Sequence, residues 1–454
     1  MTATKTILPT QAYARPDSKS AKLWERAQHV LPGGNSRTTV YMAPRPIYAA
    51  EGDGCWITDV DGDRRLDLLN NYTSLIHGHA HPAVTSAATQ RLARGASFPL
   101  PTPEEIDLAA LIVDRVPGIE QVRFTNSGSE AVMMAIKAAR GFTGRPKIAK
   151  FEGAYHGSYD WAEVSLSSGS GDWGPADAPT SVAYTKGTPP SVLEEVVVLP
   201  FNRTELAVAR IEREAGNLAA VLIDPMPNRA GLIPARPEFL RAIRKVTRAH
   251  GICLIFDEVI SFRVGYHGAQ GMFDVLPDLT TLGKIIGGGF PVGAVGGRAE
   301  VMAVFDPRGG KPAVPHGGTF NANPVTMAAG LAAMQLMDEK AFDRLDELGR
   351  KLRSGIEACF ERAGVPGGVT GLGSLFRLHP AQRTFVDFRS TAQSTQEAAR
   401  LARLHRQLID HGILISPTGL GCLSTAMGEA EVEYCLEVLN ASLQLVRGEE
   451  VGKA

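Results

Sequence analysis

Two short runs of branched apolar residues most constrain the fold of this chain. Residues 219–223 and 252–256 contain no charged residue, and each run is followed directly by an acid, Asp224 and Asp257 respectively. Runs of this kind predict strands of a parallel sheet that is covered on both faces. Between them, residues 238–250 carry apolar residues at helical spacing, and a glycine follows as a stop. The sequence therefore predicts a β-α-β unit with acids at one edge of an α/β sheet.

The length of the chain predicts more than one domain. At 454 residues it exceeds one ordinary core, since domains average about 150 residues. We expect an N-terminal arm and a segment that joins the small domain over residues 1–75, a large domain over 76–343 and a smaller α+β domain over 344–454. Residues 1–20 lack periodicity and predict a loosely ordered arm. The pattern also predicts a hairpin over 53–69, helices over 345–363, 401–411 and 430–446, and a strand over 413–416.

The charge balance and the cysteines indicate which binding partners and which cellular compartment to expect. Lys and Arg number 47 against 48 acidic residues, so the net charge of −1 gives no reason to expect a nucleic acid or a membrane as a partner. No stretch approaches the roughly 18 apolar residues of a membrane span, and no signal-peptide pattern is visible. The five cysteines are scattered, which favours free thiols. We expect a soluble, cytoplasmic protein that acts on small molecules.

Lys284 stands in a glycine-rich stretch, residues 281–289. A lysine can hold an aldehyde as a Schiff base, and an acid at a strand end can keep a pyridine nitrogen protonated. The pairing of Lys284 with Asp257 therefore suggests a pyridoxal phosphate enzyme. A Walker lysine is excluded because Ile285 follows where that motif requires Ser or Thr, and Asp278 occupies the position of its glycine. The glycines also lack the strand and helix context of a dinucleotide loop.

Two further stretches have residues suited to a bound cofactor. Ser127, Gly128 and Ser129 precede a predicted helix over residues 131–140, where backbone N–H groups and the helix dipole suit a phosphate. Ordinary capping of the helix by serine is the alternative interpretation.

Tyr155 and His156 follow a predicted strand over residues 147–151 and stand where open α/β sheets bind ligands. An aromatic ring there can stack on a pyridine, although an isolated pair of this kind is more often structural.

The cluster of His77, His79 and His81 has the appearance of a metal site. No acid lies close by in the sequence, and Pro82 directly after the cluster is a common first residue of a helix. We therefore expect these histidines to serve in capping and packing, and we predict no metal.

Together these stretches resemble the class III aminotransferases of fold type I, most closely the branch that contains glutamate-1-semialdehyde aminomutase and the β-phenylalanine (β-amino-acid) aminotransferases. The resemblance covers about residues 30–440 and is most specific at residues 257–264, 277–284 and 318–324. It implies an aspartate-aminotransferase-like fold, with a mostly parallel central sheet, helices on both faces and a smaller α+β domain.

The resemblance also implies a role for each matching residue. Lys284 would form the Schiff base and move the proton, Asp257 would pair with the pyridine nitrogen, and Thr319 would reach the phosphate of a neighbouring subunit's cofactor. That last role requires a homodimer with its active sites at the subunit interface. The remaining cofactor-binding residues implied by the family pattern are Ser127, Gly128, Ser129, Tyr155, His156 and Val259.

The candidate substrate-binding residues are arginines. Arg37, at the end of a Pro-Gly-Gly-Asn-Ser-Arg segment, resembles the family arginine that binds a substrate carboxylate, with a surface arginine as the alternative. Asp224 stands where close relatives have glutamate. Thr418 stands where β-phenylalanine-type relatives have the arginine that binds the keto-acid acceptor. Arg229 is a candidate substitute and Arg377 a weaker one, although both are also compatible with structural roles.

The resemblance implies transfer of an amino group from a carboxylate-bearing amine, with a β-amino acid favoured, to a keto-acid acceptor by a ping-pong mechanism. One alternative is an aminomutase of the glutamate-1-semialdehyde type, which needs no external acceptor, although its arginine lies a few residues further along. A second alternative is an amine transaminase for hydrophobic amines. A non-catalytic cofactor-binding protein is possible on this fold but does not explain why Lys284 and Asp257 are both present.

Overall fold

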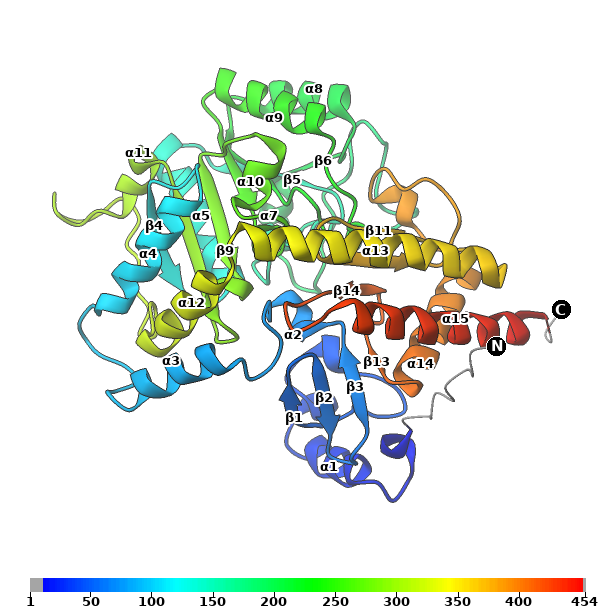
Figure 1. The fold of residues 1–454 in the computed structure, drawn as a ribbon. Helices are drawn as coiled ribbons and strands as arrows, with labels where there is room; N and C mark the ends of the chain where they lie inside the picture. Colours follow the sequence, from blue (N-terminus) through cyan, green and yellow to red (C-terminus); the bar gives the residue numbers. More distant parts are fainter. Residues whose placement is uncertain (1–10, 452–454) are drawn as a thin grey trace.

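The computed structural model describes residues 11–451 and contains, within them, a large seven-stranded sheet and two smaller sheets (Figure 1). In the large sheet β10 is antiparallel to both of its neighbours, and the other strand pairs are parallel. The predicted mostly parallel sheet is confirmed. Its strands, in spatial order, are β4 (Gln121–Thr125), β10 (Gly293–Gly297), β9 (Leu279–Gly283), β8 (Cys253–Asp257), β7 (Leu218–Ile223), β5 (Lys147–Phe151) and β6 (Val196–Leu199).

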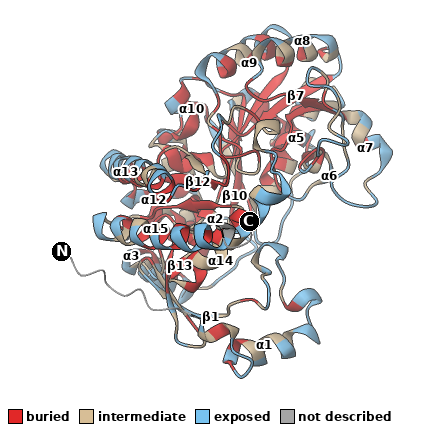
Figure 2. Cartoon of the chain, turned by 90° about the vertical axis from the view of Figure 1, so that its right-hand side faces the viewer, coloured by how far each residue is buried: buried red, intermediate tan, exposed pale blue. Residues whose placement is uncertain are grey.

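Helices cover both faces of the large sheet, which explains its apolar strands. Val221 and Ile223 of β7 belong to the core beneath α8 (Thr204–Glu214) and α9 (Pro237–Ala249). The alternate residues of the same strand pack instead with α5 (Gly128–Thr143). Because successive strand residues point to opposite faces, a strand covered twice must be apolar throughout. The predicted β-α-β unit is confirmed, and these strands form the buried centre seen in Figure 2.

One of the two smaller sheets joins segments from the two ends of the chain, and the other lies wholly within the C-terminal part. The predicted hairpin is the β2–β3 pair, and β13 from the C-terminal part pairs with β3 in parallel. A strand before the hairpin, β1, was not predicted, and the predicted strand over 413–416 is only two residues long. The sheets are β1 (Ala49–Asp53), β2 (Trp56–Asp59), β3 (Arg64–Asp67), β13 (Ile413–Leu414), and β11 (Gly368–Thr370), β12 (Leu375–His379), β14 (Leu420–Cys422). The pairing supports an N-terminal segment that joins the small domain, but the domain boundaries stay a prediction.

The three predicted C-terminal helices exist and begin earlier than expected. Helix α13 (Glu339–Ala363) is capped by the Asp338 side chain, and α14 (Thr395–Asp410) by a capping box of Ser394 and Glu397. Their first turns are polar, so an apolar pattern alone places the start too late. Helix α15 (Glu429–Val451) runs beside α13 in Figure 1. The other helices are α1 (Lys19–Gln28), α2 (Asn70–Thr73), α3 (Pro82–Leu92), α4 (Pro103–Arg115), α6 (Asp160–Glu163), α7 (Pro190–Glu195), α10 (Gly268–Phe273), α11 (Ala299–Met302) and α12 (Pro324–Leu336).

The expectation of a loose N-terminal arm is wrong for residues 11–20. Tyr13 is fully buried, and its hydroxyl donates a hydrogen bond of 3.1 Å to Asp410 of α14. Ser18 caps α1 through its side chain. Residues 1–10 of the predicted arm lie outside the described residues.

Within residues 11–451, no helix has the length and apolar composition needed to cross a membrane. All five cysteines are buried and free of disulfides.

Candidate active site

A cavity of about 330 Å³ lies where β8 and β9 end, at the carboxyl edge of the large sheet. Both strands deliver a predicted residue to it, because neighbouring parallel strands end at the same edge. Eight of the predicted site residues line this cavity: Ser127, Gly128, Ser129, Tyr155, His156, Asp257, Val259 and Lys284.

Lys284 follows β9 directly and has a φ of +53°. A left-handed conformation is costly for a residue with a side chain, and it persists where the surrounding structure enforces it. The Nζ atom donates a hydrogen bond of 3.0 Å to the carbonyl oxygen of Tyr72. Burial lowers the pKa of Lys284 to about 8. At pH 7 the Lys284 side chain is therefore the neutral, nucleophilic amine in about one tenth of the molecules.

The carbonyl that binds Lys284 belongs to a short left-handed turn. All four residues of α2 have positive φ angles, from 47° at Asn70 to 71° at Thr73. Left-handed backbone costs roughly 1–2 kcal/mol per residue with a side chain. Asparagine tolerates this conformation best, which fits the two asparagines at the start of the turn. Tyr72 was not predicted as a site residue, and the Asn70–Asn71 pair is the only local signal for the turn.

Asp257 is buried and held by three donors. Thr281 Oγ1 and the backbone N–H of Val259 donate to Oδ1 at 3.0 Å and 3.1 Å. The Nδ1 atom of His156 lies 2.7 Å from Oδ2. Charge-assisted bonds of this kind fix the orientation of a carboxylate and stabilise its charge. The predicted aspartate is thus a preoriented anion in the same cavity as Lys284.

His156 lies behind Asp257 and orients it. Burial lowers the pKa of His156, so the ring is neutral near pH 7 and carries its proton on Nδ1, where Asp257 accepts it. The other ring nitrogen, Nε2, is buried and has no hydrogen-bond partner within residues 11–451. A buried polar atom of this kind is an available acceptor for a group bound in the cavity. Tyr155, by contrast, is partly exposed at the cavity wall.

The predicted phosphate loop forms the N-terminus of α5. Ser127 caps this helix by accepting a hydrogen bond of 3.2 Å from Glu130 N, so the capping interpretation is also correct. A Cβ at Gly128 would lie 2.9 Å from Val259 Cγ1, and one at Gly157 would collide with the Ser129 side chain. The two glycines let backbone approach closely at a helix N-terminus, where free N–H groups suit a dianion.

Asp224 lines the same cavity beyond Asp257. Burial, and then the charge of Asp257, raise the pKa of Asp224 well above its ordinary value. The second carboxyl group therefore favours its neutral, protonated form, which leaves Asp257 as the anion of the pair.

The arginines and Thr319 lie around this cavity rather than in it. Arg37 is exposed, and its Nη1 donates a hydrogen bond of 2.8 Å to Asn71 Oδ1, a residue that lines the cavity. Arg229 and Thr418 line a separate cavity of about 860 Å³. Thr319 lines a third hollow, about 520 Å³ in volume. Of the three predicted residues outside the Lys284 cavity, only Arg37 bonds to its wall among the described contacts.

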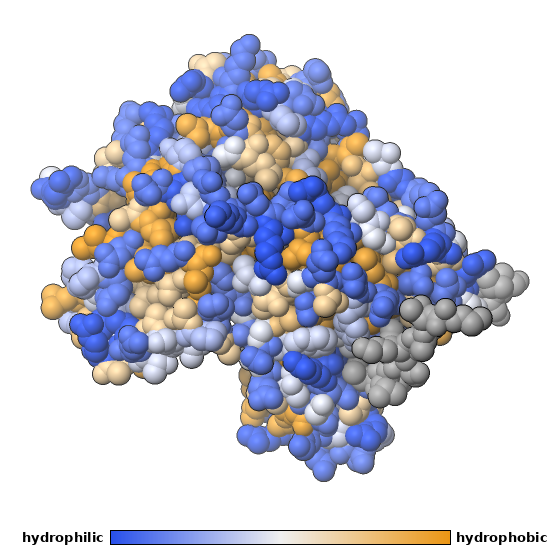
Figure 3. Space-filling model, in the orientation of Figure 1, coloured by the Kyte–Doolittle hydropathy of each residue, from blue (hydrophilic) through white to orange (hydrophobic). Residues whose placement is uncertain are grey.

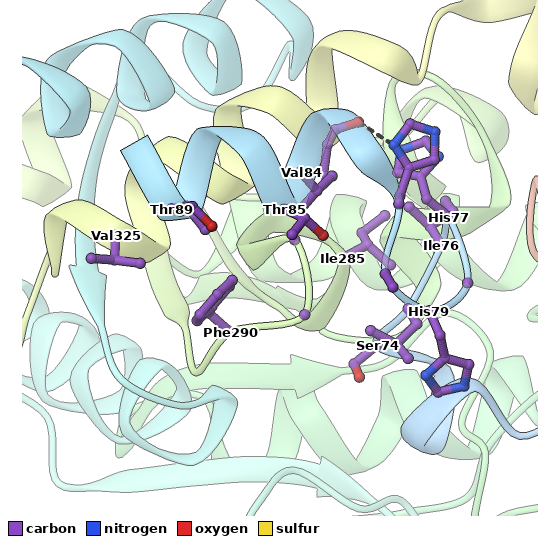
Figure 4. A pocket seen from close by; sticks show the side chains of 18 of the residues that line it. Ser74, Ile76, His77, His79, Val84, Thr85, Thr89, Ile285, Phe290 and Val325 are labelled. Carbon is purple, nitrogen blue, oxygen red and sulfur yellow. Dashed lines mark hydrogen bonds between the residues drawn. The ribbon is translucent and has the colours of Figure 1, made fainter. Parts of the chain in front are cut away.

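The histidine cluster lines an apolar cavity of about 350 Å³ next to Ile285 (Figure 4). His77 bonds the carbonyl of Ala333 at 2.8 Å, which confirms packing, and Pro82 begins α3 as expected. The expected capping by a histidine is wrong, because His81, the N-cap residue of α3, makes no capping hydrogen bond with its side chain. The expectation that no acid is near is wrong in space, since His79 Nε2 lies 2.8 Å from Asp67 Oδ2. The described residues contain no group of three or more side chains suited to a metal ion.

The cavity residues match the chemistry of pyridoxal phosphate. The group needs an amine for its aldehyde, an anion for its pyridine nitrogen and N–H donors for its phosphate. Lys284, Asp257 and the start of α5 supply these three, and the free Nε2 of His156 adds a buried acceptor beside Asp257.

Comparisons with known proteins agree with this chemistry. The sequence pattern of the aminotransferase class-III family matches residues 39–427. A glutamate-1-semialdehyde 2,1-aminomutase of Methanothermobacter thermautotrophicus is 39% identical over 422 residues, which cover 92% of this chain and 97% of that protein.

Solved structures show the same fold. An omega-transaminase from Sphaerobacter thermophilus is 57% identical, with a TM-score of 0.94, and the match covers 96% of this chain and 99% of that one. A beta-phenylalanine aminotransferase from Variovorax paradoxus is 36% identical, with a TM-score of 0.84 and coverage of 95% of each chain. The chain belongs to the class III aminotransferases, a family of enzymes that depend on pyridoxal phosphate.

Proposed function

We propose that this enzyme transfers an amino group from a carboxylate-bearing amine, with a β-amino acid favoured, to a keto acid. The observation that carries the proposal is Arg37 beside Asn71 at the wall of the Lys284 cavity. A guanidinium binds a carboxylate with two parallel hydrogen bonds. An anchor at this wall would orient a donor so that its amine-bearing carbon faces Lys284.

The proposed chemistry assigns one task to each buried group. Pyridoxal phosphate, when bound, withdraws electrons from the carbon that loses its proton. Lys284 Nζ, which donates to the Tyr72 carbonyl, would accept that proton and return it in the opposite direction of the reaction. Asp257, held by Thr281 and His156, keeps the pyridine nitrogen protonated. The start of α5 and Ser129 bind the phosphate, while Tyr155 and Val259 flank the ring.

A homodimer is part of the proposal. Several large apolar side chains are exposed on α3, α4 and the loops near them, and apolar atoms gather on the left of the face shown in Figure 3. Exposed apolar surface of this extent favours a protein partner. A second copy of the chain would cover it and bring Thr319 to the partner's cofactor. The side chains are Leu92, Phe98, Leu100, Ile106, Phe290 and Phe320.

Two alternatives have specific support. The aminomutase name of the 39% identical relative favours an isomerase, and the omega-transaminase name of the 57% identical one favours turnover of amines without a carboxylate.

A cytoplasmic location is also proposed, and the free cysteines support it because a reducing compartment keeps thiols unpaired.

Single half-reactions test the proposal. The cofactor-loaded enzyme is mixed, without an acceptor, with racemic β-phenylalanine, L-alanine or 1-phenylethylamine, and loss of the cofactor's visible absorbance is recorded. Fast loss with β-phenylalanine and little with 1-phenylethylamine is the expected result. Equal loss with 1-phenylethylamine would replace the proposal with an amine transaminase. No loss with any donor, together with isomerisation of glutamate-1-semialdehyde, would replace it with the aminomutase.

A further inference from the structure

The cavity of about 860 Å³ that Arg229 and Thr418 line contains two arginines that lack an acidic partner among the described residues. Arg229 and Arg377 line it together with Trp173, Phe388 and Tyr41. Its wall thus combines these two cations, and Arg406 paired with Asp410, with aromatic surface. A cavity with this composition suits an organic anion.

Neither guanidinium is neutralised by the described part of the chain. Arg377 Nη1 donates to the carbonyl of Asn228, while its Nε is buried and finds no hydrogen-bond partner in the described residues. Among the described carboxylates, none forms an ion pair with Arg229 or Arg377. Burial, and then the positive charge of Arg229, lower the pKa of Arg377 to about 10, so it is still charged at pH 7. Two neighbouring cations without an anion are costly, and a bound carboxylate relieves that cost.

Tyr72 bonds Lys284 and also lies near Arg229. Its carbonyl oxygen accepts the bond from Lys284 Nζ, and its hydroxyl donates to the carbonyl of Thr39. Burial raises the pKa of the Tyr72 hydroxyl, while the Thr39 bond and the charges of Arg37 and Arg229 oppose that rise. Arg229 therefore lies near the phenol end of Tyr72, and Lys284 lies at its backbone end. A ligand that reaches both must be several bonds long.

The sheet β11-β12-β14 explains how the cavity gains a positive charge that Thr418 cannot supply. Arg377 of β12 pairs directly with Leu420 of β14, and Thr418 is two residues before Leu420. Arg377 and Thr418 line the same cavity. The neighbouring strand therefore supplies a guanidinium to the cavity that the Thr418 loop leaves uncharged.

We propose that Arg229 and Arg377 bind the distal carboxylate of a dicarboxylic keto acid of the 2-oxoglutarate type, which acts as the amino acceptor. The inference rests on the proposed aminotransferase function and names its acceptor class. The keto group of such an acid would face Lys284, and the second carboxylate would lie beyond Tyr72 between the two guanidinium groups. The aromatic wall would contact the carbon chain.

Paired acceptors test the proposal. The donor half-reaction first converts the enzyme to its amino form, and recovery of absorbance is then followed with 2-oxoglutarate or with 2-oxopentanoate, which has the same length but no distal carboxylate. Wild-type enzyme should prefer 2-oxoglutarate by at least about tenfold in kcat/KM, as expected when charged hydrogen bonds are lost. Arg377→Met and Arg229→Met should remove that preference, because they should lower kcat/KM for 2-oxoglutarate much more than for 2-oxopentanoate. Arg241→Met, on the exposed side of α9, is the matched control and should retain the preference.

Absence of a wild-type preference, or equal loss with both acceptors in the variants, would overturn the site. A binding measurement separates this failure from failure of the proposed function. Glutarate carries both carboxylates but cannot accept an amine, and its affinity for the holoenzyme can be measured by calorimetry. At least about tenfold weaker binding to Arg377→Met supports the site even if no donor reacts, and unchanged binding contradicts it.

Discussion

The hydrogen bond from Thr281 to Asp257 makes a direct test of the proposed cofactor site. Thr281→Val removes the hydroxyl that donates to Asp257 Oδ1 at 3.0 Å and changes the volume of the side chain little. Thr281 itself is fully buried, so no water replaces the lost donor without rearrangement. Asp257 keeps the bonds from His156 and Val259 N. The variant therefore weakens one anchor of the carboxylate without removing the carboxylate.

The expected loss of cofactor affinity follows from the negative charge of Asp257, which accepts the hydrogen bond. A hydrogen bond to a charged group contributes about 1.5–3 kcal/mol, which corresponds to about 10- to 150-fold in an equilibrium constant. We expect pyridoxal phosphate to bind the variant at least about tenfold more weakly, because part of this energy orients Asp257 toward the pyridine nitrogen. Absorbance titration of the cofactor-free protein measures the Kd.

Thr280→Val is the matched control. Thr280 is the preceding residue of β9, equally buried, and its hydroxyl bonds Gln270 rather than Asp257. Both variants should lose similar stability in thermal unfolding, but only Thr281→Val should lose cofactor affinity. Equal Kd values for the two variants would refute the role given to Asp257 and its donors.

Three other predictions concern the residues around the cavity. Lys284→Ala should slow amino transfer by at least about 100- to 10,000-fold, the usual size of an acid–base contribution, while the cofactor still binds noncovalently; normal turnover in the purified variant would refute the assignment. Arg37→Ala should lower kcat/KM for β-phenylalanine about tenfold or more and leave 1-phenylethylamine unchanged, with Arg45→Ala, whose guanidinium donates to the carbonyl of Arg15, as the control; equal losses would make Arg37 structural. Covalent cofactor loading should accelerate about tenfold per pH unit below pH 8 and level off above it, because Lys284 with a pKa of about 8 is protonated below that pH and neutral above it. Stopped-flow absorbance from pH 6.5 to 9.5 measures this rate, and a rise that continues toward pH 10 would contradict the effect of burial.

The elements that the sequence predicted correctly have a local physical cause. Strands β7 and β8 are covered on both faces, so burial appears directly in their composition. Lys284 and Asp257 meet because β8 and β9 are parallel neighbours, with Asp257 opposite Thr281. The positions of Asp257 and Lys284 at strand ends were therefore enough to predict the location of the cavity from the sequence.

The features that the sequence did not predict depend on distant contacts. Tyr13 is buried in part because Asp410 and Arg406 of α14, at the other end of the chain, contact it. Asp67 meets His79 through the packing of β3 against a loop, which no spacing along the chain reveals. The Lys284–Tyr72 bond joins residues 212 positions apart. The Arg229–Arg377 cavity likewise needs the small sheet to be formed, although both arginines were candidates.

Identification of the lysine that binds the cofactor tests the central claim most directly. Borohydride reduction of the loaded enzyme fixes pyridoxal phosphate to its lysine, and peptide mass spectrometry then locates it. Lys150 is a built-in comparison, because it is also fully buried and burial lowers its pKa to about 7, yet its Nζ bonds the carbonyls of Ala154 and Val164 and it does not line the cavity. The account predicts the label on Lys284 alone and its loss in Lys284→Ala. Label on Lys150, or on any other lysine, would contradict it.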